Sequence, residues 1–526
     1  MHKQPLSARL PKRWVLTRWL SILMFLPVTP RTLRLVVISK QELHHKKPAL
    51  CRLFAFSWRV FLLLSSVLLA SCEDSDTLAE QRLAGGLATF GTSHLVRFDM
   101  PVTSLSAQQK SDFYAGRALA HQPWVTAPAS TSARDGLGPL FNARSCLGCH
   151  IEGGRGTLPT DDSEPVFTAF VRLSIPGESI ESGSVPEPTY GHQVQTQATG
   201  LKSQLGLPTG PGDLRAEADL RVIWEETPFK YPDNTVVTLG RPRIDLRDIA
   251  YGPMHPETLF SLRQAPAMFG VGLIEAIRQS DIDRLADPED LNQDGISGRV
   301  NQVWSVSDGA VSYGRFGWKA NRPDIETTVA AAFADDIGIS NTLFPVQPCT
   351  EAQPLCLKQP TGNNQDGVEL PDDLLTLTVE FLRHTGVPAA RLSKDHEAGE
   401  QLFHSIGCQQ CHQPSFVTSD DASAVHLAGQ KIWPYSDLLL HDMGNGLADN
   451  RPDYAASGHE WRTAPLWGIG LQKNTGKTLS LLHDGRARSV EEAIIWHGGE
   501  ALRSRNAFVE LDKQDRQQLI NFVEAL

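Results

Sequence analysis

Long apolar runs are missing from most of this 526-residue chain. No stretch after Cys72 has 18 consecutive apolar residues, which excludes an ordinary membrane-spanning helix from that part. We therefore expect the residues after Cys72 to form a soluble body, with 41% apolar residues in the chain to build its cores. The length favours two to four domains and excludes a small scaffold stapled by disulfides.

Positive charge is also scarce once the N-terminal segment is set aside. Residues 1–71 hold 12 of the 49 Lys and Arg residues and one of the 60 acidic residues. The rest of the chain keeps 37 basic and 59 acidic residues, a net charge of about −22. Such a charge argues against nucleic acid as a partner and favours cationic or small neutral partners.

One short apolar run stands near the N-terminus, in "SWRVFLLLSSVLLASC" (57–72). It follows basic residues, is too short to span a bilayer comfortably and ends in small residues, which together predict an export signal. The "LASC" ending at Cys72 resembles the lipobox of bacterial lipoproteins, in which the cysteine is acylated and becomes the new N-terminus. This resemblance implies a leader and lipoprotein signal over residues 1–72 and a lipid-anchored protein of the bacterial periplasm or cell envelope. A plain signal peptide that contains a cysteine is the alternative.

Cysteine is rare, with 8 residues in the whole chain. Cys51 lies in the leader and Cys72 at the lipobox, so six cysteines remain. Four of them form two Cys-x-x-Cys-His strings, "SCLGCH" (145–150) and "GCQQCH" (407–412). Chance would produce such a string in roughly 0.004 chains of this length, so two copies are a strong signal.

The two strings have the spacing that covalent haem attachment requires. Each thiol adds across one haem vinyl group, and the adjoining histidine reaches the iron. A thioredoxin-like pair does not need that histidine, and a zinc ribbon would not split its ligands between two distant copies that each carry a histidine. We therefore predict two covalently bound c-type haems. The attaching and axial residues are Cys146, Cys149 and His150 in the first copy and Cys408, Cys411 and His412 in the second.

The last two cysteines, Cys349 and Cys356, stand close together in "PCTEAQPLC". An exported protein meets an oxidising compartment, where such a pair forms a disulfide. The spacing predicts a short disulfide-closed loop, with a reactive dithiol as the alternative.

The surroundings of the two haem strings also repeat. Phe141 and Phe403 each stand five residues before the first cysteine, where a helix of c-type cytochromes carries an aromatic residue against the haem edge. "RQAPAMFGVGL" (263–273) is echoed by "RTAPLWGIGL" (462–471), so the chain looks like two related halves. "LDKQDRQQLINFVEAL" (511–526) has the period of a helix with one apolar face.

Residues 155–260 are rich in Pro, Gly, Thr and Val, which suggests inserted loops and a few β hairpins. We predict a mainly α fold with two cytochrome c-like haem domains and loop or β-hairpin insertions. The N-terminal haem domain spans 73–385 and the C-terminal cytochrome c domain spans 386–526.

The stretch "DLNQDGISGR" (290–299) predicts a candidate calcium loop inside the first domain. Asp290, Asn292 and Asp294 alternate before Gly295, and Ser297 follows, as oxygen ligands do in calcium loops. The acidic residue at the twelfth position is missing, so a polar turn without calcium is the alternative.

Taken together, these motifs resemble the di-haem oxidoreductase family, also labelled thiol oxidoreductases, which is related to the bacterial di-haem cytochrome c peroxidases. The matching pieces include "DGLGPLFNARSCLGCH", "APAMFGVGLIEAI", "GRFGWKA" and "LHDGRARSVEEAIIWHGGEA", and they cover nearly all of residues 110–526. The resemblance implies an exported peroxidase-like oxidoreductase that uses hydrogen peroxide. Its first haem would be the reaction centre and its second haem an electron relay, with a small redox protein or a quinol-linked donor as partner.

The resemblance also suggests the distal ligand of the second haem. In the related peroxidases a "HDG" string precedes the distal methionine by fourteen residues; here His483 begins the string and His497 stands fourteen residues later. We therefore expect His412 and His497 to hold the second haem, with Met443 of "HDMGNG" as the rival ligand. Imidazole in place of thioether lowers the reduction potential. His441 and His483 are expected to be structural or to support the ligands.

For the first haem, the sequence leaves the sixth iron position undecided. No histidine or methionine follows His150 within forty residues, and the nearest are His192, Met254, His255 and Met268. Either the position is open and binds peroxide, or a distant loop fills it. Glu275 and Arg263, in the shared pieces, are the candidate acid/base residues, and an exposed helix position is the alternative for Glu275.

Two other functions stay open. A membrane-tethered electron-transfer cytochrome would have two six-coordinate irons and no catalytic activity. A literal thiol oxidoreductase would have to use Cys349 and Cys356, because haem attachment consumes both Cys-x-x-Cys pairs.

Overall fold

The computed structural model describes residues 77–526, apart from 93–96, 132–133, 211 and 476–477. The export signal and Cys72 lie outside these residues, so the leader stays a prediction. No described helix is both long and apolar enough to cross a bilayer. The described residues from 77 to 526 all belong to one compact unit, and the domain boundary expected after residue 385 stays a prediction.

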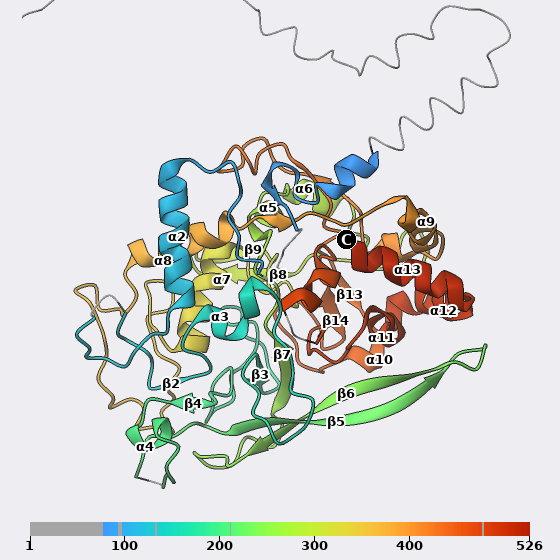
Figure 1. Ribbon diagram of the computed structural model, residues 1–526. Helices are drawn as coiled ribbons and strands as arrows, with labels where there is room; N and C mark the ends of the chain where they lie inside the picture. Colours follow the sequence, from blue (N-terminus) through green and yellow to red (C-terminus); the bar gives the residue numbers. More distant parts are fainter. Residues whose placement is uncertain (1–76, 93–96, 132–133, 211, 476–477) are drawn as a thin grey trace, which may run out of the picture. The chain divides into compact units, whose positions relative to one another are not determined.

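Helices and strands are interspersed along the chain (Figure 1). The helices are α2 (Ala107–His121), α3 (Cys146–Cys149), α4 (Leu201–Gln204), α5 (Val271–Glu275), α6 (Gln279–Asp283), α7 (Ile325–Ala332), α8 (Asp372–Arg383), α9 (Glu397–Ser405), α10 (Gly444–Leu447), α11 (Val490–Trp496), α12 (Leu502–Glu510) and α13 (Lys513–Ala525). The strands are β1 (Thr89–Phe90), β2 (Leu140–Phe141), β3 (Ala169–Ser174), β4 (Gln197–Ala198), β5 (Asp219–Lys230), β6 (Val236–Arg247), β7 (Leu259–Gln264), β8 (Gln302–Ser305), β9 (Ala310–Tyr313), β10 (Val387–Pro388), β11 (Phe416–Val417), β12 (Lys431–Ile432), β13 (Leu440–Asp442) and β14 (Glu460–Arg462).

The expected mainly α fold is wrong. Only 29% of the described residues are helical and 18% are strand, and every described sheet has two strands. This combination of helices and small two-stranded sheets does not confirm the two expected cytochrome c-like domains. Phe141 and Phe403, at equal spacing from their cysteines, lie in the strand β2 and the helix α9 respectively. The same local pattern thus formed different elements, because β2 finds a partner strand in β4.

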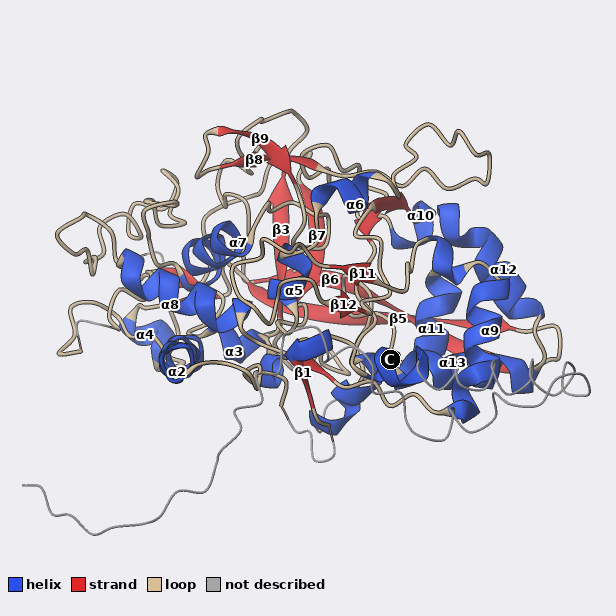
Figure 2. Cartoon of the chain, turned by 90° about the horizontal axis from the view of Figure 1, so that it is seen from above, coloured by secondary structure: helices blue, strands red, loops and turns tan. Residues whose placement is uncertain are grey.

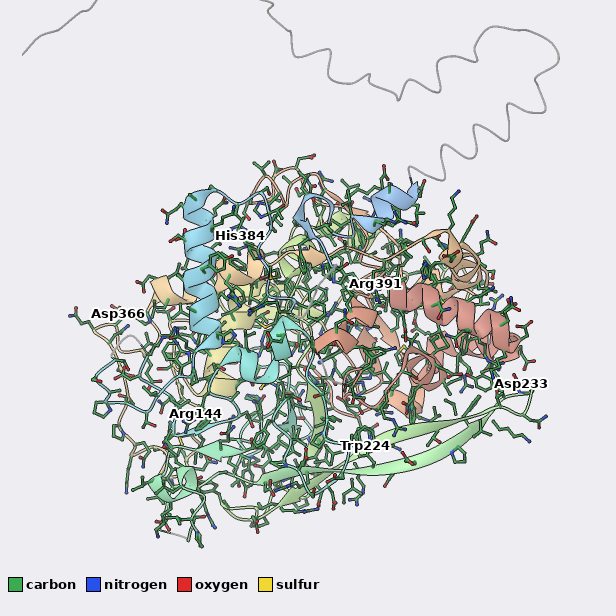
Figure 3. The ribbon with its side chains drawn as sticks, viewed as in Figure 1. Arg144, Trp224, Asp233, Asp366, His384 and Arg391 are labelled. Atoms are coloured by element: carbon green, nitrogen blue, oxygen red, sulfur yellow. A yellow bond between two sulfur atoms is a disulfide. The ribbon has the colours of Figure 1, made fainter. Side chains whose placement is uncertain are left out.

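The segment 155–260 supplies most of the strand content. β5 and β6 form a twelve-pair antiparallel hairpin that runs from Asp219↔Arg247 to Lys230↔Val236. Figure 3 shows Asp233 at the end of this hairpin and Trp224 farther along it. Near the tip, Asp233 pairs with Arg516 at 2.5 Å, and the Tyr231 hydroxyl donates to Glu491 at 2.9 Å. The hairpin is therefore held against α11 and α13, in the second half of the sequence.

One large core joins the two halves of the sequence. Figure 2 shows α2, α7 and α8 on one side of β3 and β7, and α9, α11, α12 and α13 on the other. The buried aromatic residues of this core come from both sides; they include Phe98, Phe113, Phe381, Phe403, Phe508 and Phe522. On α13, Leu519, Phe522 and Val523 are buried, as the helical pattern predicts.

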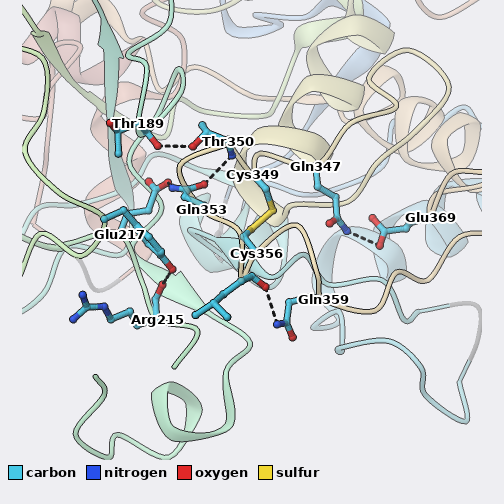
Figure 4. The surroundings of a disulfide bond; sticks show 12 residues. Thr189, Arg215, Glu217, Gln347, Cys349, Thr350, Gln353, Cys356, Gln359 and Glu369 are labelled. Atoms are coloured by element: carbon cyan, nitrogen blue, oxygen red, sulfur yellow. Dashed lines mark hydrogen bonds between the residues drawn. A yellow bond between two sulfur atoms is a disulfide. The ribbon is translucent and has the colours of Figure 1, made fainter. Parts of the chain in front are cut away.

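The disulfide between Cys349 and Cys356 is present, which confirms the prediction (Figure 4). The loop that it closes packs against the start of β5. The Gln353 side-chain amide donates to the Glu217 carboxylate, and the Thr350 hydroxyl donates to the Thr189 carbonyl at 2.7 Å.

Candidate functional site

The first Cys-x-x-Cys-His string forms the single-turn helix α3. The backbone N–H of His150 donates to the Cys146 carbonyl at 3.0 Å, and its ring Nδ1 donates to the Pro266 carbonyl at 2.6 Å. Burial, together with the nearby Asp336 carboxylate, raises the pKa of both thiols to about 12, so they stay protonated at neutral pH.

The second string repeats this local geometry. The backbone N–H of His412 donates to the Cys408 carbonyl at 3.0 Å, and Nδ1 donates to the Tyr435 carbonyl at 2.9 Å. Burial lowers the pKa of His412 to about 4 and also lowers that of His150. Both rings are therefore neutral, and Nε2 makes no hydrogen bond to any described residue. A neutral imidazole whose Nδ1–H is fixed by an acceptor is the form that ligates metals.

A large apolar cavity lies beside the second string. It encloses about 1350 Å³ of empty space, its open mouth included, and is lined by Cys408, Cys411 and His412. Its apolar lining includes Phe403, Leu447, Leu466, Ile469, Leu481, Val490 and Leu519. The cavity therefore opens onto both thiols and the axial histidine at once.

Both expected distal ligands reach this cavity. His497 follows α11, and its Nδ1 donates to the Ala493 carbonyl at 2.7 Å. Burial lowers the pKa of His497, so it has the same neutral form as His412. Met443 lines the cavity as well, and the choice between His497 and Met443 stays a prediction.

Two arginines in the cavity wall, Arg155, which is buried, and Arg462, which is half-buried, test whether a haem would fit. Arg155 and Arg462 both line the cavity, and burial lowers the pKa of each to about 10, so both stay cationic at neutral pH. The Nε atom of Arg155 is buried and has no hydrogen-bond partner in the described structure. Buried guanidinium groups require an anionic partner, and a haem carries two propionates. The thiols, the imidazoles and these cations together fit a haem.

A stacked pair of aromatic rings stands at one side of the cavity. Trp461 and His483 both line it, with ring centroids 3.5 Å apart and planes at 8°. The ammonium group of Lys319, which is fully buried, lies 4.4 Å from the Trp461 ring centroid and donates to Asp449 at 3.0 Å. The sequence reasoning missed Trp461 and Lys319, although Lys319 lies in the quoted "GRFGWKA".

His441 lies between two acidic side chains, and its supporting role stays a prediction. Burial disfavours its charged ring, but Asp437 at 2.8 Å and Glu500 at 2.7 Å raise its pKa well above the usual value. Cys411, Asp437 and His441 bring three ligand atoms within 4.8 Å of one another. A thioether bond from Cys411 to haem would remove the thiolate that a metal ion would need.

The model of the family described as "di-haem oxidoreductase, putative peroxidase" matches residues 80–526. The match covers most of the chain. The chain belongs to the di-haem oxidoreductase family. No curated protein and no solved structure shows a significant match.

In this di-haem oxidoreductase, the two predicted acid/base residues have clear structural contacts. The Glu275 carboxylate accepts from the Ile325 backbone N–H at 3.1 Å and from Arg383 at 2.9 Å. Arg263 is buried and donates to Asp453 at 2.8 Å. Neither residue lines the large cavity, and their catalytic roles stay predictions.

Asp336 is an acidic residue near the first haem string that the sequence reasoning did not select. It lies in the π-helical turn η4 (Phe333–Ile337) and influences both thiols of that string electrostatically. Burial raises the pKa of Asp336 to about 6. Two acids inside the apolar stretch "AAAFADDIGI" were the signal that could have found it.

The candidate distal residues of the first haem have different surroundings. His192 lines a separate cavity with Asp335, and burial lowers the pKa of His192 to about 4. Met268 is buried in the core. Met254 packs near the hairpin, and the backbone N–H of His255 donates to Glu187. The sixth ligand of the first haem stays undecided between these residues and an open position.

The candidate calcium loop lies beside the second haem string. Gln410 of that string donates to the Asp294 carboxylate at 3.2 Å. The Asp290 carboxylate accepts from the Gly295 backbone N–H, Asp294 accepts from the Asn292 amide, and the Ser297 hydroxyl donates to Glu500. Calcium binding stays a prediction.

Proposed function

We propose that this family member is an exported, lipid-anchored di-haem c-type cytochrome that reduces hydrogen peroxide. The first haem would be the reaction centre and the second haem the electron relay. The repeated histidine geometry carries the proposal: in both strings a neutral imidazole follows two thiols, with Nδ1 fixed by a carbonyl and Nε2 available. A bound haem would supply the iron that binds peroxide and exchanges electrons.

The residues near the first string would manage the proton. Cleavage of peroxide needs a group that takes a proton from one oxygen and returns it to the other, and such a group works best with a pKa near the working pH. Asp336 has that property, because burial raises its pKa to about 6. Glu275 and Arg263 remain the alternatives for this role.

The residues around the large cavity would hold the second haem. His412 and His497 would be its axial ligands, and Arg155 and Arg462 would face its propionates. Two imidazole ligands would give a lower reduction potential than imidazole with Met443. A small redox protein or a quinol-linked donor would supply electrons, and the acidic charge of the chain favours a cationic protein donor.

A non-catalytic electron-transfer cytochrome is the second candidate function. The half-buried His192 supports this function, because it lies next to Asp335. Asp335 is the neighbour of Asp336, whose carboxylate acts on the first cysteine pair. If His192 closed the first iron, both haems would be six-coordinate. A thiol oxidoreductase has less support, because the described disulfide between Cys349 and Cys356 lies in a structural loop.

The test uses the full-length protein, exported in cells that mature c-type cytochromes. Its mass should exceed the polypeptide mass by two haems, and the double variants C146S/C149S and C408S/C411S should each lose one. The air-oxidised protein should show a high-spin ferric band from one haem and should consume peroxide with a reduced cytochrome as donor. A colourless protein would contradict the haem assignment, and two low-spin haems without peroxide turnover would favour the electron carrier.

A further inference from the structure

A second cavity lies next to the large one and opens to solvent. It is a groove of about 1260 Å³, its open mouth included, between the hairpin strand β6, the strand β7 and the loop of His483 and Asp484. Its walls include the apolar side chains of Ile244, Leu246, Phe260 and Leu262. Its polar lining includes Asp449, His483, Asp484 and Arg486. Below, these residues are called the hairpin groove.

His483 separates the hairpin groove from the cavity of the second haem, because it lines both. The His483 ring stacks on the Trp461 ring, with 3.5 Å between the two ring centroids. A molecule in the groove would therefore be one imidazole ring away from the haem cavity. Such a short separation would allow electrons to pass from a molecule in the groove to a haem in the cavity.

The ring of His483 lacks a hydrogen-bond partner among the described residues. His483 is 5% exposed, and its closest ion contact is Asp484 Oδ2 at 3.8 Å, which is too long for a hydrogen bond. Its ring nitrogens are not among the fully buried polar atoms that lack a partner, so they can be reached from the cavities that the ring lines. Burial lowers the pKa of His483 to about 3, so the ring is neutral and one of its nitrogen atoms is an acceptor. The other ring nitrogen carries a proton, so a hydroxyl group, which both donates and accepts, can pair with either nitrogen.

The carboxylates of the groove are already neutralised. Asp484 receives two hydrogen bonds from the Arg486 guanidinium, at 2.9 and 2.7 Å from Nε and Nη2. Asp449 accepts from the buried Lys319 and from the Ser261 hydroxyl. Glu225, the third carboxylate of the lining, pairs with Arg243 at 3.4 Å, and Arg241 beside it is exposed to solvent. Each carboxylate thus has a cationic partner, so the groove does not select a cation. Its apolar walls and hydroxyl acceptors suit a neutral aromatic molecule with hydroxyl groups.

We propose that the hairpin groove binds a hydroquinone-type reductant, with its ring against the apolar walls and one hydroxyl donating to His483. From there its electrons enter the cavity of the second haem. This inference rests on the haem assignment of the proposed function. The reductant is either a hydroquinone dissolved in water or a quinol dissolved in the membrane.

The electron balance of this step matches peroxide reduction. The hydroquinone gives up two electrons, one at a time, and two protons, and becomes the quinone. The electrons pass toward the second haem, and the protons leave through the open mouth of the groove. Reduction of one hydrogen peroxide to two water molecules takes up two electrons and two protons.

The first test variant fills the groove without touching the haem cavity. Ile249 lines the groove and is 43% exposed, so the substitution I249W adds bulk with little cost to folding. V236W is the matched control, because Val236 is exposed on the strand β6, which ends two residues before Ile249, and does not line the groove. H483F keeps an aromatic ring against Trp461 but removes the acceptor nitrogen.

Binding to the haem-loaded protein is measured first, without peroxide, by titration calorimetry with 2-naphthol and with naphthalene. The parent protein and V236W should bind 2-naphthol at least tenfold more tightly than naphthalene. H483F should lose this preference, and I249W should bind both compounds at least tenfold more weakly. Unchanged binding by I249W, equal loss in V236W, or an intact hydroxyl preference in H483F would overturn the proposal.

Stopped-flow reduction of the haems then identifies the source of the reductant. Menadiol in solution or decylubiquinol in phosphatidylglycerol vesicles should reduce the parent protein and V236W at least tenfold faster than I249W. Failure of both reductants would overturn the proposal. If no donor supports peroxide turnover, the proposed function fails, but these binding and reduction results still decide whether the groove takes a hydroquinone.

Discussion

Three histidines share one arrangement at the residue scale. His150, His412 and His497 each donate from Nδ1 to a backbone carbonyl, and burial lowers the pKa of each ring. The carbonyl fixes the tautomer, because Nδ1 must carry the proton to donate it. Nε2 is then left as the acceptor or ligand atom. The common arrangement makes His497 a better candidate than Met443 for the second haem.

The variants H497A and M443A separate the two distal ligands. Loss of the His497 imidazole should convert the second haem from low-spin to high-spin. This change removes roughly half of the low-spin signal if the first haem is also low-spin. It removes nearly all of that signal if the first haem has an open position. M443A should leave the spectrum unchanged. Optical and electron paramagnetic resonance spectra of the oxidised variants measure this. The opposite result, with spin change only in M443A, would assign the ligand to Met443.

At the element scale, the long hairpin depends on a buried acid at its base. Glu217 precedes β5, is fully buried, and accepts from the Gln195 backbone N–H at 2.6 Å and from the Gln353 amide. Figure 4 shows Glu217 beside the loop closed by the disulfide. Burial raises the pKa of Glu217 to about 8. The joint between the hairpin and the disulfide loop therefore contains a carboxyl group that keeps its proton at neutral pH.

Glu217 should make the stability of the protein fall as the pH rises. Its folded-state pKa of about 8 lies above the unfolded value of 4.5. The protonated form therefore contributes stability that is complete below pH 4.5 and is lost as the pH approaches 8, on the order of 3–5 kcal/mol. E217Q should lose less stability than the parent between pH 5 and pH 8, measured by thermal unfolding.

The control for this measurement is E225Q, on the same hairpin. Glu225 is exposed and forms a pair with Arg243 at the surface, so its removal should leave the pH dependence unchanged. Parallel pH curves for E217Q and the parent would show that Glu217 is not the group responsible.

At the scale of the whole molecule, the described body forms one core from both halves of the sequence. The hairpin from the first half contacts α11 and α13 in the second. The large cavity beside Cys408 is lined by Arg155 and Trp318, which precede Cys408 in the chain by 253 and 90 positions, as well as by residues around Cys408. A substitution in the N-terminal part of the chain should therefore change the surroundings of a haem bound beside Cys408.

Attachment to the membrane should depend on Cys72 alone. Replacement by C72S removes the thiol that a lipid would modify, so the haem-loaded protein should move from the membrane fraction to the soluble fraction. The matched control is C51S, which removes a leader cysteine and should remain with the membrane. Fractionation followed by haem staining measures both. A C72S protein that stays with the membrane would contradict the lipid anchor.

Chemistry that depends on spacing along the chain could be predicted from the sequence. The two Cys-x-x-Cys-His strings, the short disulfide loop and the family membership each rest on residues within one segment or on a fixed order of segments. Local spacing is enough here, because neighbouring residues must lie close together in any fold. The helical face of α13 is predictable for the same reason.

The tertiary structure alone decided what faces the haem cavity and how the inserted segment folds. Arg155 and Arg462 are 307 positions apart in the chain, and both line one cavity. Their meeting depends on long-range packing that no local pattern records. The strands of 155–260 likewise depend on partners elsewhere, since strand formation is set by pairing and burial more than by intrinsic propensity. That is why the helical content was overestimated and the groove beside His483 was not foreseen.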